Sequence, residues 1–144
     1  MYFDFNNSKG EVRQHLLEYL RLINADEKKH DKDVEMIITI AVDNGMSGTE
    51  LKALIMDIDA GKVTKPNNPK EIFDQIFYLI NLSLHDDYFN NTEFDFCVDM
   101  AELYGVESNI APKMVREIYN CIKLEMKEDD IVKELISKSI YPIS

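Results

Sequence analysis

Four acidic residues with a repeated spacing have the clearest potential for chemistry in this chain. Asp26 and Asp33 flank one short polar loop, and Asp86 and Glu93 flank a second loop, each 60 residues further on. Hard cations such as Ca²⁺ and Mg²⁺ prefer several oxygen ligands, which carboxylates supply. If the two loops come together, the four acids form a candidate site for one of these divalent cations.

The same acids also have a structural interpretation. Asp33 and Glu93 stand where helices are expected to begin, and the partial positive charge of a helix N-terminus stabilises acids there. Asp26 and Asp86 would then be ordinary loop acids that bind nothing. Both interpretations fit the residues, so metal binding is one expectation and a site without ligand is the other.

Two His-Asp pairs suggest an enzyme as a further alternative. His30-Asp31 and His85-Asp86 resemble the paired ligands of metal-dependent HD-type phosphohydrolases, which are also all-α. That class needs another His upstream, for which the sequence offers only His15. The 60-residue repeat places His30 in a loop and aligns it with Asn90. We therefore predict that the protein is not an enzyme.

Charge limits the partners that the chain can bind. The net charge is −11, from 27 acidic and 16 basic residues. Such a charge opposes binding to phosphate backbones and to anionic lipid surfaces, so neither nucleic acid nor membrane is expected. It suits cations or the basic surface of a protein partner, and it also keeps a small protein soluble. Protein partners are the expectation.

Apolar residues predict a water-soluble protein with helical elements. No apolar run approaches the roughly 20 residues that a membrane-spanning helix needs. The start of the chain lacks the basic and apolar regions of a signal peptide, so we expect a cytoplasmic protein. Cys97 and Cys121 fall on apolar stripes without a metal-binding motif, which predicts two buried free thiols.

Helix signals occur along the whole chain and predict about seven helices. Capping residues and apolar spacing place their starts near Ser8, Asp31, Ser47, Asn68, the end of the second acidic loop, Asn109 and Asp129. Gly45 and Gly105 are expected as left-handed caps that end the second and fifth helices. The third helix is expected to run to about Ala60, with Ile55 among its inward residues. The seventh is expected to present Ile131, Val132, Leu135 and Ile136 to the core.

A repeat relates the two halves of the chain. The apolar pattern of residues 11–58 recurs without a gap in residues 71–118, as in Leu16 and Ile76. A polar linker, residues 61–68, separates the two copies. Helical repeats of this kind bury one another's apolar faces. We therefore predict a single all-α domain, residues 1–144, made of two three-helix repeats and a C-terminal helix.

Two aromatic residues lie within the second acidic loop. Tyr88 and Phe89 stand where the first loop has Lys28 and Lys29. Loop aromatics can contact a partner, but they more often fold back over the edge of a core. We expect the second behaviour.

The loops and the helices beside them resemble a known family. In residues 82–106, and more loosely in 22–46, an apolar helix leads to an Asp, an acidic loop, an acid seven residues after that Asp, and a second helix that ends at Gly. This pattern resembles the tellurite-resistance TerB-like domain. Where that family has Gly directly after the first Asp, this chain has Glu27 and Asp87, so a different loop backbone is expected.

The resemblance implies a fold and a role. It implies an all-α bundle of pseudo-repeated helices whose acidic loops gather as a possible divalent-cation site. It also implies a cytoplasmic stress-response role, exerted by binding partners. We therefore expect a non-enzymatic binding protein, with an HD-type phosphohydrolase or a ligand-free interaction module as alternatives.

Overall fold

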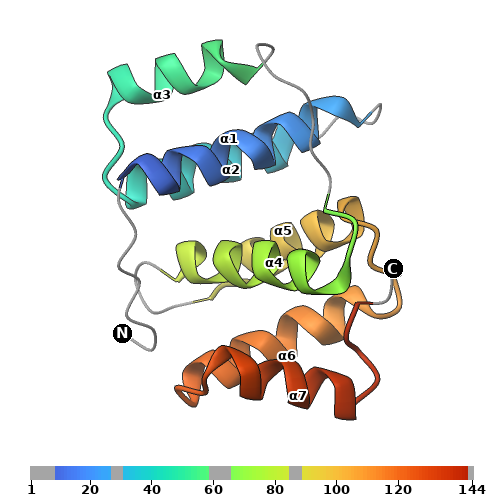
Figure 1. Ribbon diagram of the computed structural model, residues 1–144. Coiled ribbons are helices and arrows are strands. Elements are labelled where there is room, and N and C mark those ends of the chain that lie inside the picture. Colours follow the sequence, from blue (N-terminus) through green and yellow to red (C-terminus); the bar gives the residue numbers. More distant parts are fainter. Residues whose placement is uncertain (1–8, 27–30, 59–65, 85–88, 143–144) are drawn as a thin grey trace. The chain divides into compact units, whose positions relative to one another are not determined.

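The computed structural model describes residues 9–26, 31–58, 66–84 and 89–142, and these contain seven α-helices and no β-strand (Figure 1). The all-α class predicted from the sequence is therefore confirmed. The chain divides into two compact units, residues 6–65 and residues 66–144. This division falls within the polar linker that the sequence predicts. Among the described residues no helix is both long enough and apolar enough to cross a membrane.

The first unit consists of α1 (Lys9–Ala25), α2 (Asp31–Asp43) and α3 (Gly48–Met56). The long α1 packs against both other helices, so it needs a wider apolar face than a helix with one neighbour. That face includes Tyr19, which is fully buried although the apolar spacing did not mark it. The buried hydrophobic residues of the first unit are Leu16, Leu17, Tyr19, Leu20, Leu22, Ile23, Ile37, Ile40, Ala41 and Leu54.

The C-terminal end of α3 corrects one prediction. The helix ends at Met56, not near Ala60, and its C-cap is Asp57. Arg21 of α1 donates hydrogen bonds to the carbonyls of Asp57 and Ile58, at 3.1 and 3.3 Å. Arg13, also on α1, forms an ion pair with the Asp57 carboxylate. The Arg21 contacts satisfy carbonyls that a further helical turn would otherwise bind, so the chain leaves the helix here.

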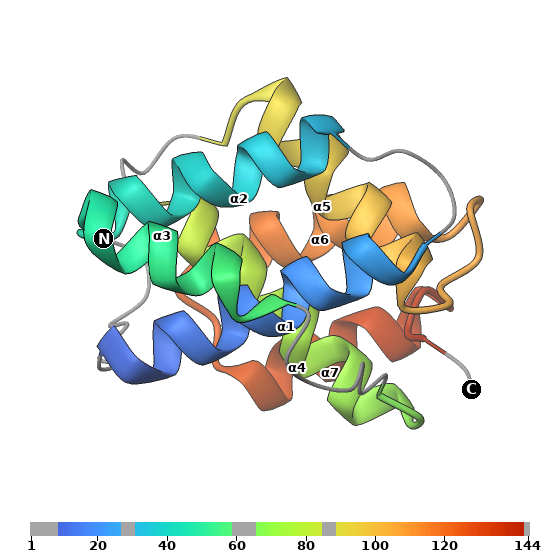
Figure 2. The ribbon, with the colours of Figure 1, turned by 90° about the horizontal axis from the view of Figure 1, so that it is seen from above.

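The second unit consists of α4 (Pro69–Ser83), α5 (Asn91–Leu103), α6 (Ala111–Lys123) and α7 (Glu128–Ser137). Helix α6 packs against each of the other three, and α5 runs beside both α4 and α6 (Figures 1 and 2). The start of α4 matches its sequence signals, because the Asn68 side chain caps the helix and Pro69 occupies its first turn. The largest fully buried side chains of the unit are Phe73, Ile76, Leu79, Ile80, Leu82, Met100 and Met114.

Two residues expected in the core lie at the surface instead. Ile55 of α3 is 48% exposed and Ile136 of α7 is 57% exposed. In each helix the preceding residue, Leu54 or Leu135, is fully buried. Successive side chains on a helix point about 100° apart, so these short helices, which bury a narrow face, cannot turn both neighbours inward.

Left-handed turns end four of the helices. Gly45 after α2 and Gly105 after α5 have φ of +92° and +100°, which confirms their prediction as caps. Glu125 after α6 and Ser139 after α7 adopt φ of +57° and +58°. In each turn the next residue's N–H donates to a helix carbonyl five positions earlier, as from Val106 to Ala101 at 3.0 Å. This is the Schellman arrangement, which satisfies carbonyls at the helix end.

The predicted repeat has a partial counterpart in the helix bounds. Helices α2 and α5 begin and end 60 residues apart, and their closing turns at Gly45 and Gly105 make the same three backbone hydrogen bonds. The offset does not hold for α3 and α6, which begin 63 residues apart. Superposition of the whole repeats stays a prediction.

Candidate functional site

Three of the four candidate metal ligands lie in the described part of the chain. Asp26 directly follows α1 and is half-buried, and its N–H donates to the Ile23 carbonyl at 3.3 Å. Asp33 lies in the first turn of α2 and is only 4% exposed. Glu93 lies in the first turn of α5. Asp86 lies outside the described residues.

Glu93 takes part in a capping box at the start of α5. Its backbone N–H donates to Asn90 Oδ1 at 2.8 Å, and its Oε1 accepts from the Asn90 N–H at 3.0 Å. Two N–H groups that the helix leaves without intrahelical partners are satisfied in this way. The sequence carries the signal for this box, an Asn followed three residues later by Glu, although the helix start was predicted from the end of the acidic loop instead. These two hydrogen bonds therefore support the structural interpretation of Glu93, in which it stabilises the start of a helix.

The gathering of the four acids stays a prediction. Asp26 and Asp33 belong to the first unit and Glu93 to the second. Within residues 9–26, 31–58, 66–84 and 89–142, no three His, Cys, Asp or Glu side chains are grouped so that they could hold a metal ion.

Of the histidines offered for a hydrolase, only His15 falls in the described residues. Its ring lies beside Tyr19 on the same helix, with 6.2 Å between ring centroids. His30 and His85 lie outside the described residues, so the HD-type alternative stays untested.

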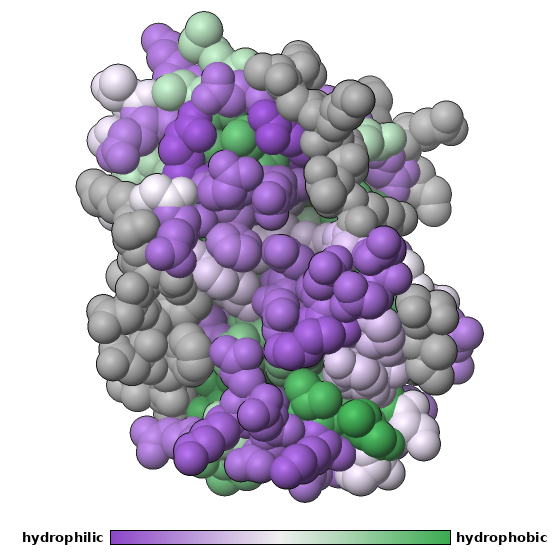
Figure 3. Space-filling view, viewed as in Figure 1, coloured by the Kyte–Doolittle hydropathy of each residue, from purple (hydrophilic) through white to green (hydrophobic). Residues whose placement is uncertain are grey.

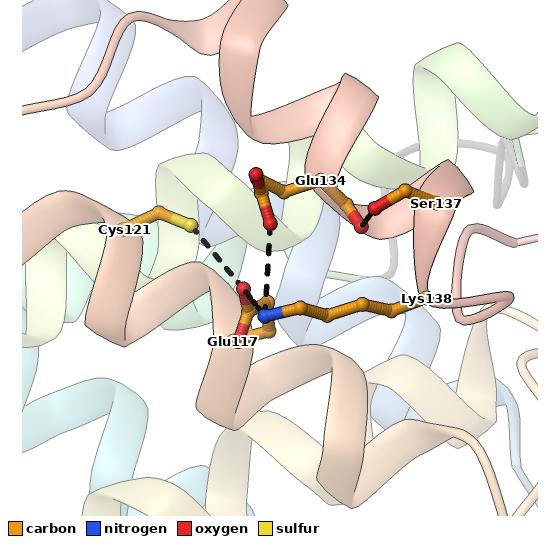
Figure 4. Close-up of polar contacts among 5 residues, drawn as sticks. All are labelled: Glu117, Cys121, Glu134, Ser137 and Lys138. Carbon is orange, nitrogen blue, oxygen red and sulfur yellow. Dashed lines mark hydrogen bonds and ion pairs between the residues drawn. The ribbon is translucent and has the colours of Figure 1, made fainter.

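A cluster that the sequence did not predict joins α6 to α7 (Figure 4). Lys138 Nζ lies 2.6 Å from Glu117 Oε2 and 3.6 Å from Glu134 Oε2. The Cys121 thiol donates to the same Glu117 oxygen at 3.7 Å. The Ser137 hydroxyl donates to the Glu134 carbonyl at 2.9 Å. A cysteine beside a lysine and two carboxylates could in principle be a nucleophile, so its protonation state decides what the cluster does.

The electrostatics of this cluster indicate a structural role, in which it holds α6 and α7 together. Burial, followed by the nearby Glu117 carboxylate, raises the pKa of Cys121 to about 11, so the thiol is protonated and unreactive at neutral pH. The hydrogen bond to Glu117 raises the pKa of Lys138, which stays charged. Burial also raises the pKa of Cys97, whose sulfur lies 4.0 Å from the Ser83 hydroxyl. Both cysteines are free and buried, as predicted.

The exposed face of α6 carries a row of three basic residues and an asparagine. Lys113, Arg116, Asn120 and Lys123 are all exposed and follow one another at helical spacing. The Arg116 guanidinium lies 4.3 Å from the centroid of the Phe94 ring on α5. The Lys123 ammonium lies 5.1 Å from the Tyr119 ring. We call Lys113, Arg116 and Lys123, together with Asn120, the basic face.

Phe89 contacts Phe94 and Tyr119, the two rings that lie against cations of this face. It is 7% exposed, and its ring lies 4.8 Å from Tyr119 and meets Phe94 edge-on at 6.2 Å. Such aromatic pairs add to the free energy gained by burial. Phe89 therefore folds over the core edge, which confirms that expectation. Tyr88 lies outside the described residues.

Helix α5 carries the opposite charge on its exposed side. Thr92, Asp95, Asp99 and Glu102 are all exposed, and their spacing equals that of Lys113, Arg116, Asn120 and Lys123 on α6. The helix contains no Lys or Arg. We call Asp95, Asp99 and Glu102, together with Thr92, the acidic face.

Exposed apolar side chains and a hollow are further surface features of the described residues. Apolar surface interrupts the hydrophilic side chains over α6 and α7 in Figure 3, and Leu124 and Ile136 of these segments are 73% and 57% exposed. In the first unit, Met56 at the end of α3 is 77% exposed. The hollow in that unit is lined by Val12, Ala41, Asn44, Met46 and Glu50.

The basic face was not predicted from the sequence, although part of its signal is visible there. Residues 113, 116 and 123 fall on one side of a predicted helix and are all basic in an otherwise acidic chain. The ring contacts give no such signal, because Phe94 and Arg116 belong to different helices. Comparison of the chain with protein-family models, curated proteins and solved structures found no match.

Proposed function

We propose that the protein is a non-enzymatic binding module whose basic face on α6 recognises an acidic helix of a protein partner. The observation that supports this most is the placement of Arg116 and Lys123 over aromatic rings. The other described cations of the unit that make close contacts, Lys70 and Lys138, are paired with carboxylates, and Lys70 lies over the Phe73 ring as well. Arg116 and Lys123 instead lie over aromatic rings, so their N–H groups can still donate hydrogen bonds to a partner.

Ring contacts prepare these cations for binding. A long basic side chain that becomes fixed on binding loses up to about 2 kcal/mol of conformational entropy. A ring that already holds the cation reduces this loss, and the cation–π contact itself contributes roughly 0.5–1 kcal/mol at an exposed site. Because the guanidinium is planar, it can stack on Phe94 with its face and still donate to a carboxylate along its edge.

The charge around the basic face favours a short acidic element over a nucleic acid. Residues 66–144 contain 7 Lys and Arg against 15 Asp and Glu, a net charge of −8. A long phosphate polymer would extend past the basic face into this negative surface. A single helix with carboxylates at matching spacing contacts the basic face alone, and its longer-range repulsion is screened over about 8 Å at physiological salt.

Two further parts of this proposal come from the sequence. The resemblance to TerB-like domains supports a role in stress or tellurite responses exerted through binding, with a Ca²⁺ or Mg²⁺ ion held by Asp26, Asp33, Asp86 and Glu93. A cytoplasmic setting is supported by the two free buried thiols, which suit a reducing compartment.

Fluorescence anisotropy with a labelled helical peptide tests the binding proposal. The peptide carries glutamates at positions i, i+3, i+7 and i+10, and a matched peptide carries glutamines there. We expect the glutamate peptide to bind the wild-type protein and the glutamine peptide to bind about tenfold or more weakly, because each lost ion pair is worth up to about 1 kcal/mol.

Paired variants make this test depend on position and not on net charge. Arg116→Glu/Lys123→Glu should abolish binding of the glutamate peptide. Lys52→Glu/Lys133→Glu changes the net charge equally at exposed positions on α3 and α7 and should leave binding within about twofold, because it spares the basic face. Equal loss in the two double variants, with both folded by circular dichroism, would refute the proposal.

A further inference from the structure

The acidic and basic faces of the second unit match one another in spacing as well as in charge. Both rows follow an i, i+3, i+7, i+10 pattern, and every member of both rows is exposed. At a rise of 1.5 Å per residue, each row is about 15 Å long. An acidic helix of the kind that the basic face requires is therefore already present in the chain, on α5.

We infer that the partner of the basic face is the acidic face of a second copy of this chain. Molecules would associate head to tail, with α6 of one copy against α5 of the next. This inference rests on the proposed function, because it names the acidic helix that the basic face recognises.

Either direction of docking forms two ion pairs. With the helices parallel, Asp95 faces Arg116 and Glu102 faces Lys123. With the helices antiparallel, Asp99 faces Arg116 and Glu102 faces Lys113. Leu124 directly follows Lys123 and is 73% exposed, so it offers apolar contact at the end of the same row.

The form and strength of the association follow from this contact. A heterologous contact uses different surfaces on the two molecules and leaves an acidic face free at one end and a basic face free at the other. Exposed ion pairs contribute little each, and the net charge of −11 on every copy opposes close approach. We therefore expect weak association that increases with protein concentration and forms larger species than a dimer.

Sedimentation velocity with charge-swapped variants tests the inference. The wild-type protein should show a weight-average mass that rises with concentration up to about 1 mM, a range that detects weak complexes. Arg116→Glu/Lys123→Glu makes both faces acidic, and Asp95→Lys/Asp99→Lys makes both faces basic, so each variant alone should remain monomeric. An equimolar mixture of the two should associate again, because each variant then finds its complement.

The controls separate this inference from the proposed function. Lys52→Glu/Lys133→Glu should associate as the wild type does, since its changes lie off both faces. A monomeric wild type, or a mixture no more associated than its parts, would overturn the inference. If the glutamate peptide still binds in that case, the proposed function stands and only the second copy is excluded as partner. If the peptide also fails to bind, both the inference and the proposed function are refuted.

Discussion

Glycine substitutions at the helix ends test the fold most sharply, because the structure separates backbone strain from steric contact. Gly105 has φ of +100°, and a Cβ added there would meet no atom within 4 Å. Gly45 has φ of +92° and equally open surroundings. The cost of a side chain at either position therefore comes from the backbone conformation alone.

The expected magnitude follows from this backbone strain. An L-residue held in a left-handed conformation loses about 1–2 kcal/mol, and the lower entropy of the unfolded chain returns part of it. We expect Gly105→Ala and Gly45→Ala to cost about 1 kcal/mol each. Gly105→Val should cost about 1–2 kcal/mol or more, because a branched side chain is more restricted.

Two reciprocal substitutions serve as controls. Gly48 begins α3 without a positive φ and also has open surroundings, so Gly48→Ala should be neutral or stabilise by up to about 1 kcal/mol. Glu125 holds a φ of +57°, so Glu125→Gly should be neutral or stabilising where Gly105→Ala destabilises.

Urea unfolding followed by circular dichroism measures these free energies. The reasoning is refuted if Gly105→Ala and Gly48→Ala change the free energy of unfolding in the same direction and by the same amount. It is also refuted if Glu125→Gly destabilises as much as Gly105→Ala, because the left-handed turn would then not be the cause.

Three further predictions concern the thiol, the acidic loops and the repeat. The pKa of Cys121 is raised from 9.0 to about 11, so the unfolded state loses its proton first. The stability that the protonated thiol contributes below pH 9 should therefore be lost as pH rises to about 11. Cys121→Ala should flatten that slope in urea titrations across this range, and an unchanged slope would count against it. Millimolar Ca²⁺ or Mg²⁺ should shift the amide resonances of Asp86 to Glu93, with a weaker shift in Asp86→Asn; a spectrum insensitive to both ions removes the metal site. Residues 11–58 should superpose on 71–118 in an experimental structure, and unlike helix directions in the two halves would exclude the repeat.

Local sequence signals were sufficient for most helix bounds. Asn68 and Pro69 start α4, and Gly105 forms the left-handed turn that follows α5. Each of these residues acts on the backbone of its immediate neighbours, so its effect can be predicted from the local sequence. The end of α3 could not be read in this way. It depends on Arg13 and Arg21, which stand more than 35 positions away and reach Asp57 only once α1 and α3 have packed.

The candidate site depends even more on contacts that form only when helices pack, which the sequence does not reveal. Periodicity marks residues 113, 116 and 123 as outward-facing but does not show that Phe94 lies beneath Arg116, since that contact requires α5 and α6 to pack. The acids were visible from their spacing, yet the role of Glu93 in a capping box competes with its role as a ligand. Residue type predicts what a side chain can do, and tertiary neighbours decide which of these roles it takes.

Chemical-shift mapping of the bound glutamate peptide tests the central claim most directly, because it reports where the peptide lies. In ¹⁵N-labelled wild-type protein we predict that the largest amide shifts fall between Lys113 and Lys123 and at Phe94, and that Arg116→Glu/Lys123→Glu removes them. Shifts that are absent, or that fall mainly on α1 to α3, would contradict the assignment of the basic face as the binding surface.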